Sequence, residues 1–311
     1  MDSTAPQTCD ITAVGHFSID SITLPNRPHA VVILGGAVAY VSLVARRLDK
    51  SASVISKVGA DFPEAYVWWL QQEGIDLSGV VRLQNEQTTR FDLEYSNDLS
   101  NRLLGLKSRA SPINLNDLPN SLRARAIHIA PIAGEIPYEV VEHLKQCADV
   151  LSLDPQGLLR SFDEFGNVTC CSPVDKRLLS LIDIFKSSQD EISALTGQSD
   201  LDSAIGAVHD YGVKTVLVTL GAKGAVLSAE NAIFQIPTCD SAAVVDPTGA
   251  GDVFIGGFLA EHISQKDSLW CACVGSAAAS IVIEGIGPTF LGEKEEIYRR
   301  ARFLYEKEIK Q

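Results

Sequence analysis

The sequence predicts an α/β protein with a mostly parallel central sheet, helices on both faces of that sheet, and a small antiparallel β lid. Three observations indicate this fold. Short apolar, β-branched runs recur along the chain and alternate with segments of helical periodicity. Two segments, residues 17–33 and 88–107, break the alternation with strand-like sequence that no helix follows. Finally, no internal repeat or linker divides the 311 residues, so we expect a single domain over 1–311.

The elements of the main sheet follow one another in order. Strands are expected at residues 11–14, 52–55, 126–129, 150–153 and 215–219, and helices at 37–48, 63–73, 138–146 and 201–211. The segments 17–33 and 88–107 are interpreted as the lid, although two ordinary surface hairpins would give the same pattern. In parallel sheets, ligands bind beyond the carboxyl ends of the strands, where loops meet helix N-termini. Loop residues at that edge are therefore the first candidates for function.

Composition and charge limit the classes of function. The formal net charge is −13, which repels polyanions and argues against a general nucleic-acid role. The longest apolar stretch, residues 272–283, contains Gly275, Ser276 and Ser280 and is too short to span a bilayer. The first ten residues lack the basic and apolar regions of a signal peptide, and the seven cysteines form no CxxC pair. We expect a cytosolic protein without a membrane partner.

The most informative segment is 246–252, which reads Asp-Pro-Thr-Gly-Ala-Gly-Asp and precedes an apolar helix. Glycines bring the backbone close to a ligand, and the first amides of a helix are free to bind an anion. Gly249, Ala250 and Gly251 are therefore candidates for an anion hole, and Asp252 is a candidate base for an attacking hydroxyl. A glycine-rich turn with a capping Asp is the alternative, but it leaves Asp246 and Thr248 unexplained.

Two other segments are candidates for binding the acceptor molecule. Gly35 and Gly36 open a helix with bare backbone, and Asp20 upstream supplies a carboxylate for hydroxyl groups, which suits a polyol. After a buried-looking strand, Gln156 can bond a substrate hydroxyl and Arg160 can steady a transferring phosphate. The alternatives are tight helix–sheet packing for the glycines, and a turn with a surface charge for the second segment.

Two further segments are candidates for the phosphoryl donor and its metal. Glu191 lies at a helix start after Ser188 and can hold a water of hydrated Mg²⁺, although ordinary helix capping explains the same residues. Thr219, Gly221 and Gly224 belong to a strand and a glycine-bracketed turn, which is either a plain β-hairpin or backbone open to a nucleotide.

Taken in order, these segments resemble the ribokinase or PfkB family of carbohydrate kinases over nearly the whole chain. The motifs are Gly35-Gly36, Lys57-Val58-Gly59-Ala60-Asp61, the Glu191 segment, Val218-Thr219-Leu220-Gly221, and the run from Asp246 to Asp252. The resemblance implies a ribokinase-like three-layer α/β/α fold with a β lid. It implies Asp252 as catalytic base, 249–251 as anion hole and Glu191 as organiser of Mg²⁺.

The resemblance also implies roles at the nucleotide side. Thr219, Gly221 and Gly224 would lie along the nucleotide, with Ser188 nearby. Asp246 and Thr248 match positions that bind a monovalent cation such as K⁺ in some members, and Ser276 would lie near the base and that cation.

The departures from the family pattern bear on the acceptor at 37–40 and on the metal or phosphate site at Ser188. Ribokinases proper carry Lys and Asn in the segment matching 37–40, which here reads Ala-Val-Ala-Tyr, and the usual Asn three residues before the Glu is Ser188. Segments 134–136, 156–160, 186–191 and 283–287 are more similar to the inositol kinase branch. We expect a cyclic polyol in an inlet lined by Asp20, Arg90, Gln156 and Arg160.

The sequence therefore predicts an ATP- and Mg²⁺-dependent kinase of a small polyol, with myo-inositol as the leading acceptor, acting as a monomer or homodimer. A kinase for another sugar or a nucleoside is the alternative, in which Phe17, Phe91 and Tyr95 would stack on the base. A second alternative is a non-catalytic sensor that binds nucleotide or polyol.

Overall fold

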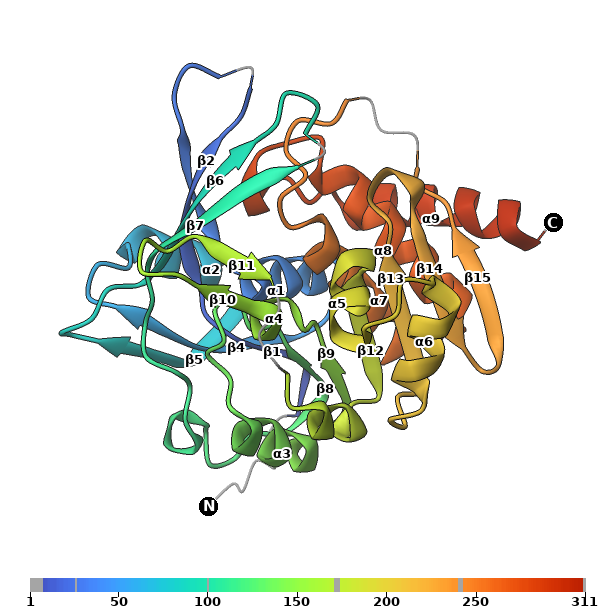
Figure 1. Ribbon diagram of the computed structural model, residues 1–311, viewed down its shortest axis with the longest axis horizontal. Coiled ribbons are helices and arrows are strands. Elements are labelled where there is room, and N and C mark those ends of the chain that lie inside the picture. Colours follow the sequence, from blue (N-terminus) through green and yellow to red (C-terminus); the bar gives the residue numbers. More distant parts are fainter. Residues whose placement is uncertain (1–7, 26, 100, 171–173, 240–242, 310–311) are drawn as a thin grey trace.

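The computed structural model describes residues 8–25, 27–99, 101–170, 174–239 and 243–309. A nine-stranded sheet forms its centre, in the order β15-β14-β13-β12-β9-β8-β1-β4-β5, and seven strands from β5 to β13 are parallel (Figure 1). The strands are β1 (Cys9–Val14), β4 (Ala52–Gly59), β5 (Ile75–Leu83), β8 (Ala124–Ile129), β9 (Ala148–Leu153), β12 (Ile184–Ser188), β13 (Thr215–Thr219), β14 (Ala225–Ala229) and β15 (Ala232–Ile236). All five strands predicted for this sheet are present.

Helices cover both faces of this sheet because the side chains of each strand alternate between two buried clusters. In β1, Ala13 belongs to one cluster and Val14 to the other. The first cluster includes α1 (Ala37–Arg47), α2 (Glu64–Gln72), α7 (Ala250–His262), α8 (Ser268–Val282) and α9 (Lys294–Ile309). The second includes α3 (Tyr138–Cys147), α5 (Gln189–Thr196) and α6 (Leu201–His209). The predicted three-layer arrangement is confirmed.

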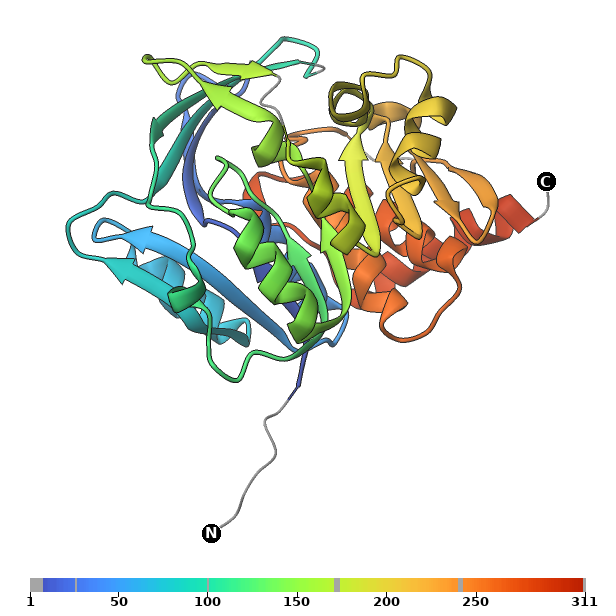
Figure 2. The same ribbon diagram turned by 60° about the horizontal axis from the view of Figure 1, so that its bottom comes forward.

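A second, four-stranded sheet stands beside one end of the large sheet (Figures 1 and 2). Its order is β3-β2-β6-β7, with β2 (Ser18–Thr23), β3 (Val31–Gly35), β6 (Thr89–Tyr95) and β7 (Arg102–Ser108). The outer pairs are antiparallel, whereas β2 and β6 are parallel. A short hairpin of β10 (Arg160–Phe162) and β11 (Val168–Cys170) extends this sheet through a bridge between Gly105 and Asn167. We call the four-stranded sheet the lid sheet.

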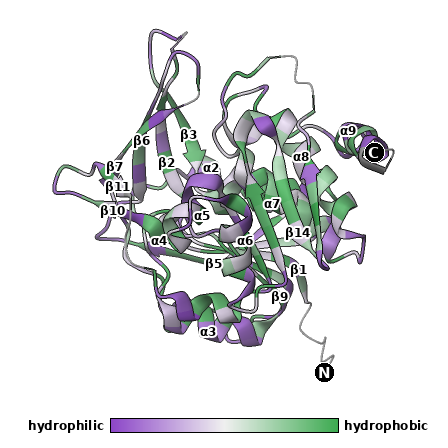
Figure 3. Ribbon diagram, turned by 45° about the vertical axis from the view of Figure 1, so that its right-hand side comes forward, coloured by the Kyte–Doolittle hydropathy of each residue, from purple (hydrophilic) through white to green (hydrophobic). Residues whose placement is uncertain are grey.

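Helix α7 is buried along most of its length. Figure 3 shows it as hydrophobic along most of its length, whereas the peripheral α3 carries hydrophilic residues. Its neighbour α8 packs close because both helices have glycine at the crossing: a side chain on Gly275 would approach the Phe254 carbonyl oxygen to 2.5 Å. This contact fixes the axis of α7 and hence the position of its first turn. In the described part of the chain, no helix is long and apolar enough to cross a membrane.

Candidate active site

The first turn of α7 forms the centre of the site. Gly249 caps this helix with φ of 78°, a left-handed conformation that favours glycine. A Cβ there would lie 2.3 Å from the ring of Tyr40, so the loop rests directly on that ring. The amides of Gly249, Ala250 and Gly251 lie at the positive end of the helix dipole, and that of Ala250 donates to the Pro247 carbonyl at 3.3 Å. The role of these amides as an anion hole stays a prediction.

Asp252 follows in the same turn, and its surroundings raise the pKa of its carboxyl to about 6. Burial is the main cause, and the nearby Asp154 carboxylate adds to it. The cations Lys186, Arg102 and Arg160 act in the opposite direction. A carboxylate with a pKa just below neutrality is ionised at pH 7 and still basic enough to accept a proton from a hydroxyl.

A buried ion pair lies beside Asp252. The Lys186 Nζ donates to Asp154 Oδ2 at 2.6 Å, and both side chains are almost fully buried. Burial alone lowers the pKa of Lys186, but Asp154, Asp252 and Glu191 outweigh it and raise that pKa. A Cβ on Gly251 would approach the ammonium nitrogen to 2.6 Å, so this cation lies directly against the predicted anion hole.

Lys186 and Asp154 were not among the predicted catalytic or binding residues. A lysine inside an apolar parallel strand, and an aspartate just after another, are the signals that could have identified them. Such charges are buried only when they are paired. Their pairing across neighbouring strands β9 and β12 depends on strand order, which the sequence does not state.

Asp246 and Thr248 hold the loop before α7 in place. Asp246 Oδ1 accepts the Thr248 amide at 2.9 Å, and its Oδ2 accepts the Gly287 amide at 3.4 Å. The Thr248 hydroxyl bonds the Tyr95 hydroxyl of the lid sheet at 2.8 Å. These contacts join the 246–252 loop, the 283–287 loop and the lid. A role for Asp246 and Thr248 in binding K⁺ stays a prediction.

On the acceptor side, Asp20 lies on the inner face of the lid sheet, which faces the 246–252 loop. Its carboxyl is only 6% exposed, and burial raises its pKa to about 6. Gly35 leaves the room for it, since a Cβ there would lie 1.9 Å from Asp20 Oδ2. Gly36, with φ of 90°, turns the chain into α1 against the His16 carbonyl. The structure thus brings Asp20, Gly35 and Gly36 together.

Gln156 and Arg160 lie at the turn that follows β9, in and after the short helix α4 (Gln156–Leu159). The Gln156 amide lies 3.5 Å from Asp252 Oδ1, and Arg160 donates to Gln156 Oε1 at 2.8 Å and to the Ile132 carbonyl at 3.0 Å. The predicted neighbourhood of Gln156, Arg160 and Asp252 is therefore present in the structure.

Arg90 does not lie with Asp20, Gln156 and Arg160. Asp20 is directly opposite Phe91 in the lid sheet, so its neighbour Arg90 points from the other face. Its guanidinium pairs with Asp61 at 2.7 Å on the outside of the lid. Arg102 of β7 occupies the inner face instead, opposite Tyr95, and its charge acts on Asp252. Arg90 was expected in the inlet, but the sequence does not show which face of β6 is turned inward.

Glu191 caps α5: its carboxylate accepts the Ser188 amide at 2.7 Å, while its own amide donates to the Ser188 hydroxyl. The capping interpretation therefore holds, and the charge of Glu191 also acts on Arg102, Arg160 and Lys186. No cluster of three metal-ligating side chains occurs in the described residues. A role for Glu191 in holding Mg²⁺ through water stays a prediction.

The nucleotide-side residues are tied into the fold in different ways. Thr219 ends β13 and its hydroxyl lies 3.3 Å from the Ser187 carbonyl. Gly221 opens the following turn with φ of 59°, whereas Gly224 is required because a Cβ at this position would lie 2.0 Å from the Ile236 carbonyl oxygen. Ser276 donates to the Pro237 carbonyl at 2.8 Å. Packing explains Gly224 and Ser276, and their nucleotide role stays a prediction.

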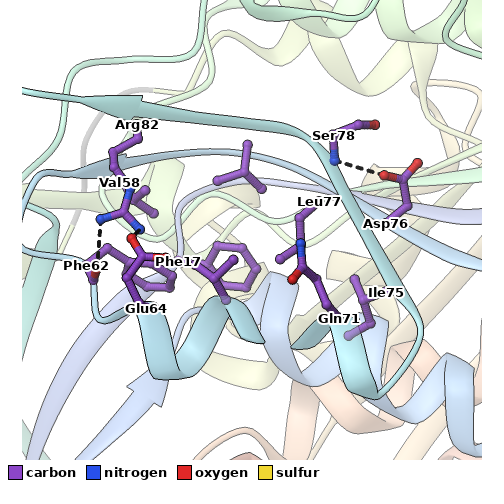
Figure 4. A pocket seen from close by; sticks show the side chains of 12 residues that line it. Phe17, Val58, Phe62, Glu64, Gln71, Ile75, Asp76, Leu77, Ser78 and Arg82 are labelled. Atoms are coloured by element: carbon purple, nitrogen blue, oxygen red, sulfur yellow. Dashed lines mark hydrogen bonds and ion pairs between the residues drawn. The ribbon is translucent and has the colours of Figure 1, made fainter. Parts of the chain in front are cut away.

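A separate hollow of about 520 Å³ lies between α2 and the strands β4 and β5 (Figure 4). Phe17, Val58 and Phe62 form part of its apolar wall, and the ion pair of Arg82 with Glu64 lies at one side. Phe17, considered above for stacking on a nucleobase, lines it, but none of the residues expected to bind or transfer the phosphoryl group does. We therefore assign the chemistry to the cluster around Asp252.

A buried carboxylate, a helix N-terminus and several cations at the carboxyl ends of parallel strands are the arrangement expected of a small-molecule phosphotransferase. Residues 9–295 match the family of pfkB carbohydrate kinases. The chain belongs to this family, whose members transfer phosphate to hydroxyl groups of sugars, nucleosides or inositol.

Several curated relatives match most of the chain. A cytidine kinase of Thermococcus kodakarensis is 28% identical over 89% of this chain and 97% of its own length. The inositol 3-kinase of Arabidopsis thaliana is 29% identical over 94% of this chain and 80% of its own length. A ribokinase of Haemophilus influenzae is 28% identical over 88% of each chain. These identities do not separate the acceptors.

Solved structures share the fold. A pyrophosphate-dependent kinase of the ribokinase family, complexed with a pyrophosphate analogue and myo-inositol, superposes with a TM-score of 0.79 at 23% identity, covering 93% of this chain and 99% of its own. Arabidopsis thaliana ribokinase with ribose and ATP gives 0.75 at 23% identity, covering 95% and 99%. The ribokinase-like fold predicted from the sequence is confirmed.

Proposed function

We propose that the protein phosphorylates one hydroxyl of a small polyol with ATP and Mg²⁺, that myo-inositol is the leading acceptor, and that Asp252 is the base. The observation that carries this proposal is the position of Asp252. It lies in the first turn of α7, beside Lys186, and within reach of the Gln156 amide on the acceptor side. This position supports Asp252 as a base that lies between the start of α7 and the polar residues of the acceptor side.

In the proposed reaction, Asp252 accepts the proton of the acceptor hydroxyl as its oxygen bonds to the γ-phosphorus. The bond from that phosphorus to the bridging oxygen breaks, and ADP leaves with the electron pair. The 249–251 amides, Lys186 and Arg160 stabilise the negative charge on the phosphoryl oxygens. Bound Mg²⁺, held through Glu191, would supply further charge neutralisation.

The structure favours a polyol over a nucleoside. A nucleobase needs an open aromatic face, and the three aromatic residues considered for that role are buried. Phe17 stacks on Phe62, Phe91 packs against Phe162, and Tyr95 bonds Thr248. The acceptor side instead offers carboxylate, amide and guanidinium groups, which bind hydroxyls. The similarity to inositol 3-kinase agrees with this choice, whereas the similarity to cytidine kinase favours the nucleoside alternative.

An acceptor panel tests the proposal. Purified protein is incubated with ATP and Mg²⁺, and ADP release is measured with myo-inositol, other inositols, ribose, fructose, cytidine and adenosine. Parallel reactions replace ATP with pyrophosphate, Mg²⁺ with EDTA, and K⁺ with Na⁺. We expect the highest kcat/KM with myo-inositol. Turnover of nucleosides alone would reject the polyol acceptor, and binding of ligands without any phosphate transfer would favour the sensor.

A further inference from the structure

A buried carboxylate, that of Glu135, lies behind the acceptor side of the site and takes no part in the phosphoryl transfer described for Asp252. It belongs to the segment 134–136, to which the proposed reaction gives no role. Glu135 lies in the loop between β8 and α3, and the residue is only 1% exposed. A charge that is removed from water needs compensating hydrogen bonds, so its partners show what it holds in place.

The Glu135 carboxylate joins two segments that are far apart in the sequence. Its Oε1 accepts the His16 amide at 2.9 Å, just before β2 begins. Its Oε2 accepts the Ala133 amide at 2.7 Å, and both oxygens lie 3.0 Å from the Ile132 amide nitrogen. Hydrogen bonds from backbone amides to an ionised carboxylate are stronger than those between neutral groups. Glu135 therefore fastens its own loop to the backbone that enters β2.

The same loop supports α4 and Arg160. The Ile132 carbonyl accepts a hydrogen bond from Arg160 at 3.0 Å, and the Pro131 carbonyl accepts the Gly157 amide of α4 at 3.0 Å. A Cβ on Gly157 would lie 2.3 Å from the Pro131 carbonyl oxygen, so α4 packs directly on the backbone of the loop. The loop thus fixes the backbone from which Gln156 and Arg160 extend.

His16 extends the link from Glu135 into the lid sheet. Its Nε2 lies 3.1 Å from the Ser111 carbonyl, which can only accept, so Nε2 carries the proton and Nδ1 accepts from the Thr89 hydroxyl at 2.9 Å. Burial lowers the pKa of the His16 imidazole, so the ring is neutral at pH 7 and keeps this pattern. Thr89 starts β6, Ser111 follows β7 and His16 precedes β2. One histidine therefore connects three segments of the lid to Glu135.

We propose that Glu135 is a positioning residue that sets Asp20, on the lid sheet, relative to Arg160, on the core. This inference rests on the proposed function. Asp20 lies on β2, which begins two residues after His16, and Arg160 is bound to the Ile132 carbonyl, so both positions depend on the one carboxylate. Phosphoryl transfer requires the acceptor hydroxyl and the phosphoryl group to be aligned, and a small misplacement of the groups that hold them slows the reaction.

Glu135→Gln tests this role. The variant keeps the size of the side chain but places an NH₂ group where a carboxylate oxygen accepted a backbone amide, so one donor faces another. With the acceptor that the wild type turns over best, we expect kcat/KM to fall about 10- to 100-fold through misplacement of Asp20 and Arg160. KM of the nucleotide should stay close to the wild-type value, because the nucleotide-side residues do not depend on this loop.

Glu261→Gln is the matched control for a loss of stability. Glu261 is also buried, at 3% exposed, and accepts from Trp270 Nε1 and the Tyr298 hydroxyl, each at 2.7 Å, at the end of α7 remote from Asp252. Both variants should lower Tm, but only Glu135→Gln should lower kcat/KM. Equal kinetic losses in the two variants would overturn the inference, and so would wild-type kinetics in Glu135→Gln.

A double-mutant cycle with Arg160→Met separates positioning from general damage. Because Glu135 acts through the loop that holds Arg160, the loss of kcat in Glu135→Gln/Arg160→Met should be smaller than the product of the two single losses. The losses of Glu261→Gln and Arg160→Met should simply multiply. Multiplying losses in the Glu135 cycle would count against the inference.

Hydrogen exchange tests the same link without any turnover. If the wild type phosphorylates no acceptor, the proposed function fails, and amide exchange measured by mass spectrometry still decides on Glu135. Residues 18–23 and 156–160 should exchange faster in Glu135→Gln than in the wild type, whereas Glu261→Gln should leave them unchanged. Unchanged exchange of these segments in Glu135→Gln would overturn the inference.

Discussion

The two halves of the site are built differently. The phosphate-binding half is built around one continuous segment, 246–252. The side chains in and beside it are paired within the protein: Asp246 with two amides, Thr248 with Tyr95, and the neighbouring Lys186 with Asp154. The acceptor half is assembled from side chains of the lid sheet, α1 and α4. There, the Asp20 carboxyl interacts with the Ser18 hydroxyl, while its Oδ1 has no partner among the described residues.

This difference has a physical meaning. A half with internal pairing is fixed before any ligand arrives, so it can serve the same phosphoryl transfer for many acceptors. A half with unsatisfied polar atoms depends on the ligand for its hydrogen bonds, and it discriminates against molecules that lack the right hydroxyls. We therefore expect mutations in the first half to change turnover and mutations in the second half to change acceptor choice.

The largest effect is expected for Asp252→Asn. The amide cannot accept the proton of the attacking hydroxyl, so kcat should fall by about 10²- to 10⁴-fold. The variant is isosteric and removes a charge that is costly to bury, so its stability should equal or exceed that of the wild type. Steady-state kinetics with the best acceptor, together with thermal unfolding, measure both quantities. Turnover within a few-fold of the wild type would contradict the role of Asp252.

A second prediction concerns the loop itself. Gly249→Ala adds a Cβ that meets the Tyr40 ring at 2.3 Å, in addition to left-handed strain of roughly 1–2 kcal/mol. We expect at least a tenfold loss of kcat with a clear loss of stability. Gly197→Ala is the matched control, because Gly197 has nearly the same φ of 76° and no atom within 4 Å of the added Cβ. It should lose stability only. Equal effects of both variants would show that the contact with Tyr40 is unimportant.

The difference between the two halves also explains how much of the structure could be predicted from the sequence. The 246–252 loop was predicted residue by residue, because conformation and chemistry there are encoded locally by glycines and a helix start. The acceptor half was predicted only in part. Gln156, expected near the base, lies beside Asp252, whereas Arg90, expected in the same inlet, lies on the face of β6 opposite to Phe91, and Arg102 was not among the expected residues. Strand facing and strand order depend on contacts between distant segments, which one sequence does not display.

The third prediction is a pH effect on the phosphate-binding half. The pKa of Asp252 is raised to about 6, so the carboxyl is protonated and inactive below that pH, and kcat/KM should rise with pH through about 6 before it levels off. Lys186→Met removes a cation that lowers this pKa. The rise of kcat/KM with pH, the acidic limb of the profile, should therefore move to higher pH. Asp154→Asn removes a carboxylate that raises this pKa and should move the limb to lower pH.

The double variant Lys186→Met/Asp154→Asn is the control for these two single variants. Each single change leaves a buried charge unpaired, which lowers stability, whereas the double change removes both charges. Its acidic limb should lie between those of the two single variants. An identical limb in all four proteins would show that a group other than Asp252 determines the pH dependence.

The smallest effect is a difference in acceptor KM between variants of two arginines of the lid sheet. Arg90 forms an exposed pair with Asp61 on the outer face, and such pairs contribute about 0–1 kcal/mol. Arg90→Ala should therefore change the acceptor KM by less than about twofold, the equivalent of a fraction of a kcal/mol. Arg102→Ala removes a cation that faces Asp252 from β7 and should raise that KM more. A larger effect of Arg90→Ala on the acceptor KM would contradict this prediction. It would show that β6 turns its Arg90 face to the acceptor.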